Sequence, residues 1–479
     1  MEDDLRMPRR NHSFESDLLL IALFAAGFLC FAQEPGQPVS PLLSGTRAAG
    51  EMLNPQKSVE GGAPEAITSS DAIARAQKIY SQYLSAATDA QVAREDALQA
   101  KNGMLPSFSY RQDYLGTQGN GKTPNGRYVT NDGVHVYRVW GVMHQDMPAG
   151  FFTGASYKRA KAAAALAGVK QEIARRGLVV TVTRNFYTLI AAQRKYASAR
   201  QSADQAAEFL DNAKKLEQGG ESAHADVVKA QLQFDQQKVA LREAELAMNN
   251  AHLALAVMLS PTFDENFTAV DDMDHLPALP PMLELRAQAA RENQDIRAAV
   301  ETLAQANADV SIARADFFPT FSLDAVYGIE ANALALHSAA AAAKQLGPLP
   351  NLGYFITASA TVPVWNWGIT RSRLKQAELR RAQATADLTQ TQREALSNFY
   401  SSYNEADAAR SEVNMLRDAA DQATESLRLT NLRYQAGEAT ALEIVDAQNA
   451  LLAARNAFDD GQARYWVALA ALQTLTGRF

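Results

Sequence analysis

The sequence is poor in the residues that build disulfides and most metal sites. It contains one cysteine, Cys30, in 479 residues, and its seven histidines form no HxH or HxxxH pair. These absences exclude a disulfide scaffold and a multi-cysteine metal site, and they argue against a metalloenzyme. Basic residues are also fewer than acidic ones: 46 Lys and Arg against 53 Asp and Glu give a net charge of −7. Without a basic excess or a basic stripe, we expect no nucleic-acid partner.

Catalytic motifs and long apolar runs are missing as well. GxSxG, GxxxxGK(S/T) and HExxH do not occur, so we expect no enzymatic activity and no cofactor. After residue 33 there is no stretch of 18 apolar residues, which predicts no transmembrane helix in the mature protein. Any membrane contact must then be made by β-strands or by the surface. The 47% of apolar residues nevertheless exclude wholesale disorder.

The amino end has the pattern of an export signal. Arg9 and Arg10 precede the apolar run LLLIALFAAGFLCF at 18–31. The run has the length of a secretory signal and is too short to be retained as a membrane anchor. We therefore expect a signal peptide over 1–32, cleaved after Ala32.

Other interpretations of the amino end stay open. Cys30 is acylated if the protein is a lipoprotein, and the apolar run is a buried segment if the protein is cytosolic. Met7 is an alternative start, because the acidic residues before it are unusual in a signal peptide. Residues 33–67 include a stretch rich in Pro, Gly and Ser, and we interpret them as a linker.

The rest of the chain repeats itself. LPSFSY at 105–110 returns as FPTFSL at 318–323, and GESAHADVVKAQ at 220–231 returns as GEATALEIVDAQ at 437–448. The two pairs occur in the same order and at nearly equal offsets. This similarity predicts a duplicated unit of about 215 residues.

Each copy is expected to contain a β-hairpin between helices. The first copy spans 68–260, the second spans 282–479, and a linker over 261–281 joins them. In the first copy we expect a hairpin at about 106–147 and helices over 68–104, 154–218 and 222–259. In the second copy we expect a hairpin at about 319–363 and helices over 282–317, 369–435 and 439–475.

The long helices carry the periodicity of a supercoil. In the second copy, small and apolar residues recur every three or four positions at Phe399, Tyr403, Ala406, Ala409, Val413, Leu416, Ala420, Ala423 and Leu427. Their average spacing of about 3.5 residues is that of a coiled-coil seam. The segment 369–435 has no internal Pro or Gly and would form a helix roughly 100 Å long. Glycines at the ends of both long helices suit the positive φ of a helix stop.

The two hairpins have the alternating pattern of strands. Phe321 to Ile329 and Tyr354 to Val362 alternate an apolar, aromatic face with a more polar one, although 134–143 alternates poorly. This pattern fits a membrane barrel with a wet lumen, and it also fits a soluble sheet packed on one side. The export signal and the long loops favour the barrel. Because four strands cannot close a barrel, several chains must share one.

Particular motifs resemble those of the outer-membrane efflux proteins, the TolC-like channel-tunnel family. They are VPVWNWG at 362–368, YQAGEATALEIVDAQNALLAAR at 434–455 and LQTLTG at 472–477. The resemblance implies a mostly α-helical homotrimer with a twelve-stranded outer-membrane barrel and a helical tunnel in the periplasm. Such proteins are exit ducts of tripartite efflux or type I secretion systems. Their partners are outer-membrane lipid, a periplasmic adaptor (membrane fusion protein) and an inner-membrane transporter.

An alternative function is a secreted or periplasmic coiled-coil scaffold or binding protein without a pore. Detergent-independent solubility would favour it. The cargo of a duct stays open among drugs, metal ions, small molecules and proteins, since duct walls are permissive.

The resemblance assigns a pore constriction to Glu443 and Asp446. These residues lie three positions apart, so they share one face of a helix. In a symmetric assembly they would form stacked acidic rings that attract cations. The alternative is a solvated helix face.

A latch that closes the tunnel is assigned to Asp226 and Tyr434. The resembled family places an arginine where this chain has Ala439. Arg433 or Lys229 then substitutes for it, or the closed end is held differently. The alternative role of Tyr434 is packing at the end of a helix.

Two further groups of residues complete the expected sites. Trp365 and Trp367 follow the last strand, where indoles favour a membrane interface, although they could equally pack between barrel and tunnel. The helix-hairpin tips are the expected adaptor contact: Gly219, Gly220, Gly437 and Glu438. Pro106, Pro319 and Pro363 are expected to mark transitions between helix and strand.

Overall fold

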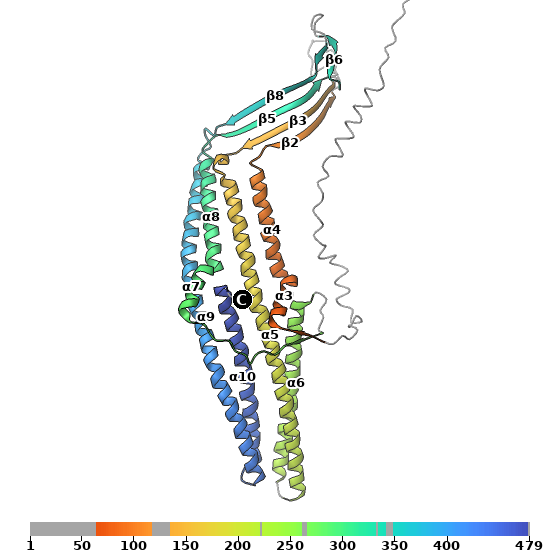
Figure 1. Ribbon diagram of the computed structural model, residues 1–479, viewed down its shortest axis with the longest axis vertical. Coiled ribbons are helices and arrows are strands. Elements are labelled where there is room, and N and C mark those ends of the chain that lie inside the picture. Colours follow the sequence, from red (N-terminus) through yellow and green to blue (C-terminus); the bar gives the residue numbers. More distant parts are fainter. Residues whose placement is uncertain are drawn as a thin grey trace, which may run out of the picture. The chain divides into compact units, whose positions relative to one another are not determined.

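The computed structural model describes residues 64–116, 135–220, 223–260, 266–331, 334–341 and 348–477. The expected signal peptide, with Cys30 and the cleavage after Ala32, lies outside the described residues. Helices dominate the described part of the chain, and the figures show them side by side with a sheet at one end (Figure 1).

Both halves of the chain have the same order of main elements: two helices, two long strands, a very long helix and a last helix. In the first half these are α3 Ser69–Ile79, α4 Ser81–Asn102, β2 Ser107–Gly116, β3 His135–Met147, α5 Ala155–Gln218 and α6 His224–Leu259. In the second half they are α7 Met282–Glu292, α8 Gln294–Ala315, β5 Thr320–Ala331, β8 Leu352–Thr361, α9 Ile369–Gln435 and α10 Ala441–Thr476.

The hairpins of the two halves join into one antiparallel sheet. Its strand order is β2-β3-β5-β8, so β3 and β5 form the contact between the halves. Pro106 stands directly before β2, Pro319 directly before β5, and Pro363 shortly after β8. The prediction that these prolines mark transitions is confirmed. A proline at these points ends one kind of structure without removing a ladder hydrogen bond.

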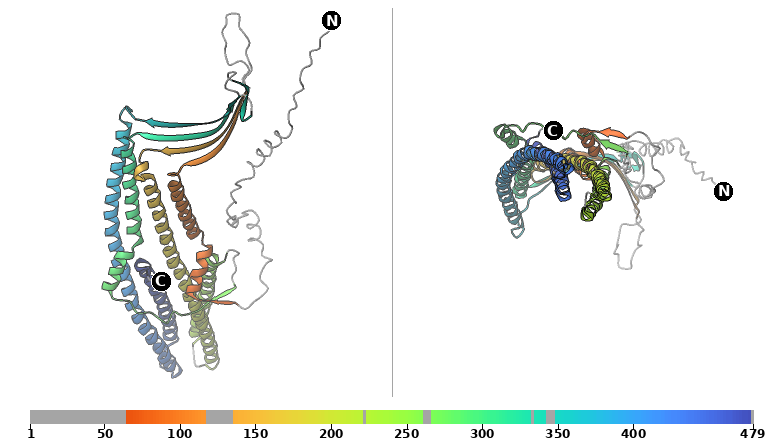
Figure 2. Two further views of the ribbon diagram at one scale, coloured as in Figure 1. Left: turned by 45° about the horizontal axis from the view of Figure 1, so that its top comes forward. Right: turned by 90° about the horizontal axis from the view of Figure 1, so that it is seen from below.

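The helices form two rows that share α5 and α9. Beside the sheet, α4 contacts α5, α5 contacts α8 and α8 contacts α9; farther away, α6, α5, α10 and α9 follow in that order. Seen along their axes, the helices lie in a curved row (Figure 2). The predicted seam of α9 is confirmed, because all nine of its residues are buried or half-buried. Small alanines in the seam let α9 and α10 pack closely along their length.

Two expected helices are each broken once. The helices predicted over 68–104 and 282–317 are interrupted at Tyr80 and Asn293, which both have extended backbones. Asn293 is nine-tenths buried, and its side-chain oxygen accepts a hydrogen bond from the Ile296 amide at 3.0 Å. Helical periodicity continues through both positions, so it did not reveal breaks that capping and tertiary packing stabilise.

Two short strand pairings and one 3-10 turn were not expected from the sequence. Strand β1 Glu65–Ile67, in the expected linker 33–67, pairs in parallel with β4 Phe267–Ala269, in the expected linker 261–281. In the loop between β5 and β8, β6 His337–Ala341 pairs with β7 Pro348–Pro350. A 3-10 turn, η1 Phe151–Thr153, connects β3 to α5.

The largest core cluster lies where the mid-part of α5 meets α3, the end of α6 and β4. Phe186 and Tyr187 of α5 are fully buried there, and Met273 of the inter-repeat segment is buried with them. Tyr187 also stacks on Trp466 of α10, with ring centroids 4.7 Å apart. The inter-repeat segment is therefore packed between helices of both halves.

Candidate functional site

One face of the sheet is apolar and exposed. A single rung crosses all four strands as Tyr110, Gly141, Tyr327 and Tyr354, and the next rung contains Phe108, Met143, Ala325 and Ile356. Tyr354 is 78% exposed, and Phe108 and Ile356 are also exposed. Apolar surface of this extent on a soluble monomer marks a contact with another molecule or with lipid.

The opposite face of the sheet carries charges that pair across strands. His144 Nδ1 lies 2.7 Å from Asp324 Oδ1, and Arg138 Nε donates to Glu330 Oε1 at 2.8 Å. The Arg138 guanidinium also lies over the Trp140 ring, 5.5 Å from its centroid. Strand β3, whose alternation looked poor, contributes all three positions. In a membrane barrel the apolar face of the strands contacts lipid and the polar face lines the water-filled lumen, so these two faces fit a barrel strand.

The expected interface tryptophans lie after β8. Trp365 and Trp367 are 76% and 86% exposed, and their rings meet edge to face at 5.7 Å. Trp367 has a φ of 55°, and it is followed by Gly368 at 83°. The Asn366 side chain hydrogen-bonds to Thr370 and anchors this bend to α9. The structure thus presents both indoles to the surroundings; their interface role stays a prediction.

The hairpin tips are built on glycines, as expected from the helix ends. Gly220 and Gly437 have φ of 74° and 78°, whereas Gly219 stays helical at −75°. At the second tip, the Glu438 amide donates to the Arg433 carbonyl at 2.8 Å. This bond closes the turn in the manner of a helix C-cap.

The two predicted latch residues are brought together within one chain. Tyr434, at the end of α9, packs against a cluster to which both helix hairpins contribute, and its ring lies 5.5 Å from that of Phe209 in the other hairpin. Burial and the negative charge of Asp226 raise the pKa of Tyr434. Asp226, in the first turn of α6, also has Lys229 Nζ 3.7 Å away. The tips of the two hairpins therefore contact each other through Tyr434, and Asp226 is near enough for its charge to act on this residue. A latch between chains stays a prediction.

Glu443 and Asp446 have different surroundings at the start of α10. The Glu443 carboxylate accepts from the Thr440 backbone amide at 3.2 Å and completes a capping box. Arg433 Nη1 lies 3.3 Å from the other oxygen of Glu443, and Arg433 Nη2 donates to the Glu438 carbonyl at 3.3 Å. Asp446 is exposed one turn further along. Arg433 thus stabilises the tip of its own hairpin. The resembled family has an arginine at the position of Ala439, and here Arg433 makes contacts in the same turn.

A charged cluster that the sequence did not reveal joins the halves of the chain. Arg194 of α5 bonds Asp271 at 2.6 Å and Asp274 at 3.1 Å, and it lies 3.6 Å from Asp459 of α10. Gln462 accepts from Arg194 at 2.9 Å. Because these residues are scattered over the sequence, no local spacing could have indicated the cluster.

Burial determines the protonation of this cluster. Asp459 is only 7% exposed, and burial raises its pKa to about 6 against the opposing charge of Arg194. Hydrogen bonds from Arg194 lower the pKa of Asp274, which is more exposed. Arg194 therefore forms ion pairs with three carboxylates whose burial differs.

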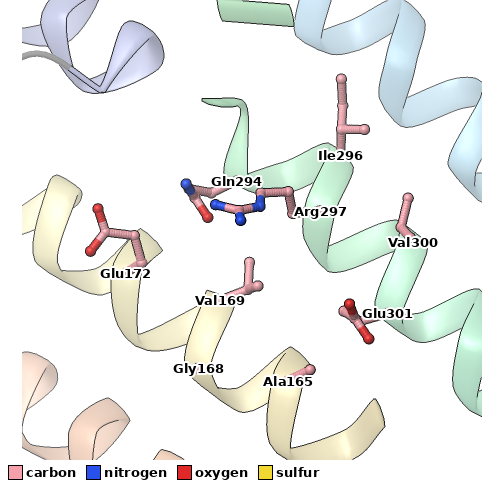
Figure 3. A pocket seen from close by; sticks show the side chains of 9 residues that line it. All are labelled: Ala165, Gly168, Val169, Glu172, Gln294, Ile296, Arg297, Val300 and Glu301. Carbon is pink, nitrogen blue, oxygen red and sulfur yellow. The ribbon is translucent and has the colours of Figure 1, made fainter. Parts of the chain in front are cut away.

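A groove of about 520 Å3 runs between α5 and α8 (Figure 3). Gly168 leaves its wall open, since a Cβ there would meet no atom within 4 Å. Glu172 on the α5 side is held by Arg175 at 2.7 Å and Arg176 at 2.9 Å. The groove lies far along the chain from the predicted constriction and latch, and it brings none of those residues together.

The side chains and helices of the described ranges bear on the class of site. No group of three or more His, Cys, Asp and Glu in them is placed to hold a metal ion. None of the helices in these ranges combines the length and the apolarity that a bilayer crossing requires.

Comparison with known proteins agrees with this architecture. Residues 285–478 match the family model described as outer membrane efflux protein. The chain is 30% identical to outer membrane protein OprJ of Pseudomonas aeruginosa over 37% of its length, and 26% identical to the pyoverdine export outer membrane protein OpmQ of the same organism over 58%. These matches span 35% of OprJ and 57% of OpmQ.

The fold is shared with a solved structure. The outer membrane protein VceC of Vibrio cholerae superposes with a TM-score of 0.72 at 19% identity, covering 86% of this chain and 96% of VceC. At that identity the likeness shows the fold alone. Together the two findings lead to one conclusion: the second repeat matches the outer membrane efflux protein family, and the chain has the fold of a solved outer membrane protein.

Proposed function

We propose that this chain is one subunit of an outer-membrane exit duct, a passive channel and not an enzyme. The sheet carries the proposal: it has an exposed apolar face, a charged opposite face and two open edges. Strands β2 and β8 each pair with one neighbour in the described part of the chain. Open edges are not tolerated in lipid, so strands of further copies must complete the sheet into a barrel.

Three copies are the number that the geometry favours. Two copies would supply eight strands, and an eight-stranded barrel is filled by its own side chains. Three copies would supply twelve strands and leave a lumen lined by the charged face. A ring of three also gives each open edge a partner of the opposite kind.

The helices carry matching edges. On α6, exposed apolar residues form a stripe with heptad spacing: Val228, Leu232, Val239, Leu246, Leu253 and Val257. On α9, at the other end of the helix row, exposed apolar residues are Leu379, Leu396, Met415, Leu429 and Leu432. Apolar residues with the spacing found on α6 pack as coiled-coil seams, and the exposed apolar residues of α9 offer them a partner surface. We therefore place α9 of one copy against α6 and α4 of the next.

The duct would serve a tripartite efflux or type I secretion system. Its helical end would lie in the periplasm, where the tips at Gly219–Gly220 and Gly437–Glu438 would meet an adaptor and, through it, an inner-membrane transporter. Glu443 and Asp446 are proposed to form the constriction, and Asp226 and Tyr434 the closing latch. The OprJ and OpmQ matches support this class of function.

Fractionation and conductance test the proposal. The protein is expected in the outer-membrane fraction as heat-modifiable trimers, and purified trimers are expected to give single-channel conductance in planar bilayers. Recovery as a soluble monomer without conductance would contradict the duct and favour the poreless coiled-coil scaffold.

A further inference from the structure

A second cleft, of about 440 Å3, opens where the sheet meets the helices. Three aromatic residues line it: Phe152 of η1, Phe318 just before β5, and Phe321 near the start of β5. Phe321 pairs with Met147 and Ala360 and belongs to the apolar face of the sheet. The cleft is therefore continuous with that face, at the end of the sheet that adjoins α8 and η1.

The wall formed by η1 is preorganised. Gly150 has a φ of 84°, and a Cβ there would come within 3.3 Å of the Ala315 Cβ. The Phe151 amide donates to the Pro148 carbonyl at 2.9 Å, and the Thr153 hydroxyl donates to the Gly150 carbonyl at 2.8 Å. These bonds hold Phe152 outward, 81% exposed. A wall fixed before binding lowers the ordering cost of a ligand.

A positively charged side chain, that of Arg314, lies at the end of the cleft next to α8. Arg314, in the last turn of α8 and four residues before Phe318, lines the cleft, and its side chain is 59% exposed. Its ion pair with Glu378 is long, at 3.8 Å. A guanidinium has five donors in a planar fork, so it can bind a phosphate while keeping this contact. The cleft thus has an apolar part toward the sheet and a phosphate-binding group on the side away from it.

We propose that this cleft binds one glycerophospholipid from the periplasmic leaflet, which rests on the proposed outer-membrane function. The Arg314 guanidinium would bind the lipid phosphate, and Phe152 and Phe318 would hold an acyl chain directed along the apolar face of the sheet. Polarity and position agree with this occupant, since the charge lies where the head groups begin and the aromatics lie where the chains begin. A lipid held here would anchor the junction of barrel and tunnel in each subunit.

Native mass spectrometry of the detergent-solubilised trimer tests the site with three probes: phosphatidylglycerol, diacylglycerol of the same chains, and inorganic phosphate. We expect up to one phosphatidylglycerol per subunit, and no retention of inorganic phosphate. Arg314→Gln should lower phosphatidylglycerol retention about tenfold, as loss of a charged hydrogen bond predicts, and leave diacylglycerol retention unchanged. The double variant Phe152→Ala/Phe318→Ala should lower retention of both lipids.

Matched controls lie on the same elements. Arg297→Gln on α8 and Phe317→Ala beside the cleft alter exposed residues that do not line it, so both should retain lipid like the parent. Equal retention by Arg314→Gln and Arg297→Gln, or displacement of the lipid by inorganic phosphate, would overturn the site. A conducting trimer without specific lipid would overturn only the site, whereas a soluble, non-conducting monomer would overturn the proposed function.

Discussion

Tyr434 combines two separable contacts at the hairpin tips. Its ring packs on Phe209, and its hydroxyl end is near the charge of Asp226. Tyr434→Phe keeps the ring, so stability should change by about 0.5 kcal/mol or less, while loss of the hydroxyl should raise the conductance of the resting channel. Tyr434→Ala also loses packing and should cost roughly 1–2 kcal/mol of stability.

Thermal unfolding and bilayer recordings on the same samples separate the two effects. If Tyr434→Phe had the stability and the resting conductance of the parent, the hydroxyl would have no latch role. Tyr434 would then be a packing residue of the tip.

Glu443 and Asp446, at the start of α10, also differ in their local roles: Glu443 belongs to a capping box and Asp446 is exposed. Asp446→Asn removes an exposed charge, and Glu443→Gln preserves a side chain that can still accept in the capping box. Together they should lower the cation preference of the channel with a stability change of about 0.5 kcal/mol or less.

Reversal potentials in a KCl gradient measure this preference. Glu301→Gln, on α8 in the other part of the helix row, should leave the preference unchanged. Unaltered selectivity of the Glu443→Gln/Asp446→Asn channel would show that the pair is a solvated helix face and not a constriction.

At the scale of the elements, glycine has opposite roles within α5 and after α9. Gly168 lies inside α5 with open space where a Cβ would be, whereas Gly437 has a φ of 78°. Gly168→Ala should stabilise the protein by roughly 0.5–1 kcal/mol through helix propensity. Gly437→Ala should destabilise it by about 1 kcal/mol, because an L side chain strains that conformation.

Thermal midpoints of the two variants check this contrast. The opposite order, with Gly437→Ala the more stable, would mean that the tip turn does not adopt the positive φ in the assembled protein. Gly168→Ala also reports on the α5–α8 groove, which an added methyl would narrow.

At the scale of the whole molecule, the stripe on α6 should decide assembly. Val239 and Leu246 are 59% and 61% exposed in the single chain. Val239→Glu/Leu246→Glu would bury two charges in the proposed seam, which is strongly unfavourable, and should abolish the heat-modifiable trimer. Gln236→Glu adds an acidic charge at an exposed polar position of the same helix and should leave the trimer intact. A trimer in both variants would remove α6 from the interface.

The Arg194 cluster should make stability depend on pH. Burial raises the pKa of Asp459 to about 6 from an ordinary value of 3.8. Between these values the folded protein holds a proton that the unfolded chain has lost, so this group favours folding increasingly as pH falls from 7 toward 4. Asp459→Asn is neutral throughout, so it should be more stable than the parent by about 1–3 kcal/mol at pH 7 and equal to it near pH 4.

Thermal midpoints at pH 7, 5.5 and 4 check the sign and the range. Asp460→Asn is the matched control, since Asp460 is exposed and pairs with Lys195 at 2.6 Å. If both variants followed the same pH dependence, burial of Asp459 would not be its source.

Much of the element order follows from local pattern. The helix predicted over 369–435 has the bounds Ile369–Gln435, because an uninterrupted heptad seam and a following glycine are sufficient to place its ends. The alternation around Phe321 and Tyr354 likewise indicated both strands of the second hairpin. Local pattern failed at Tyr80 and Asn293, where packing and a cap break helices whose periodicity continues.

The candidate sites show the same division. Spacing alone put Glu443 and Asp446 on one helix face, and family motifs indicated Asp226 and Tyr434. The electrostatic interaction of Asp226 with Tyr434 joins positions 226 and 434, and the Arg194 cluster joins 194, 271 and 459. Neither separation leaves a periodic trace in the sequence.

The sequence by itself therefore determined the period of each element, the duplicated order and the two faces of the strands, since these depend on residues within a few turns of one another. The tertiary structure alone decided which strands pair as β2-β3-β5-β8, that the inter-repeat segment enters the core, and that one half-buried arginine, Arg194, joins both halves. Such contacts depend on burial and charge contributed by distant segments, which become neighbours only when the chain folds.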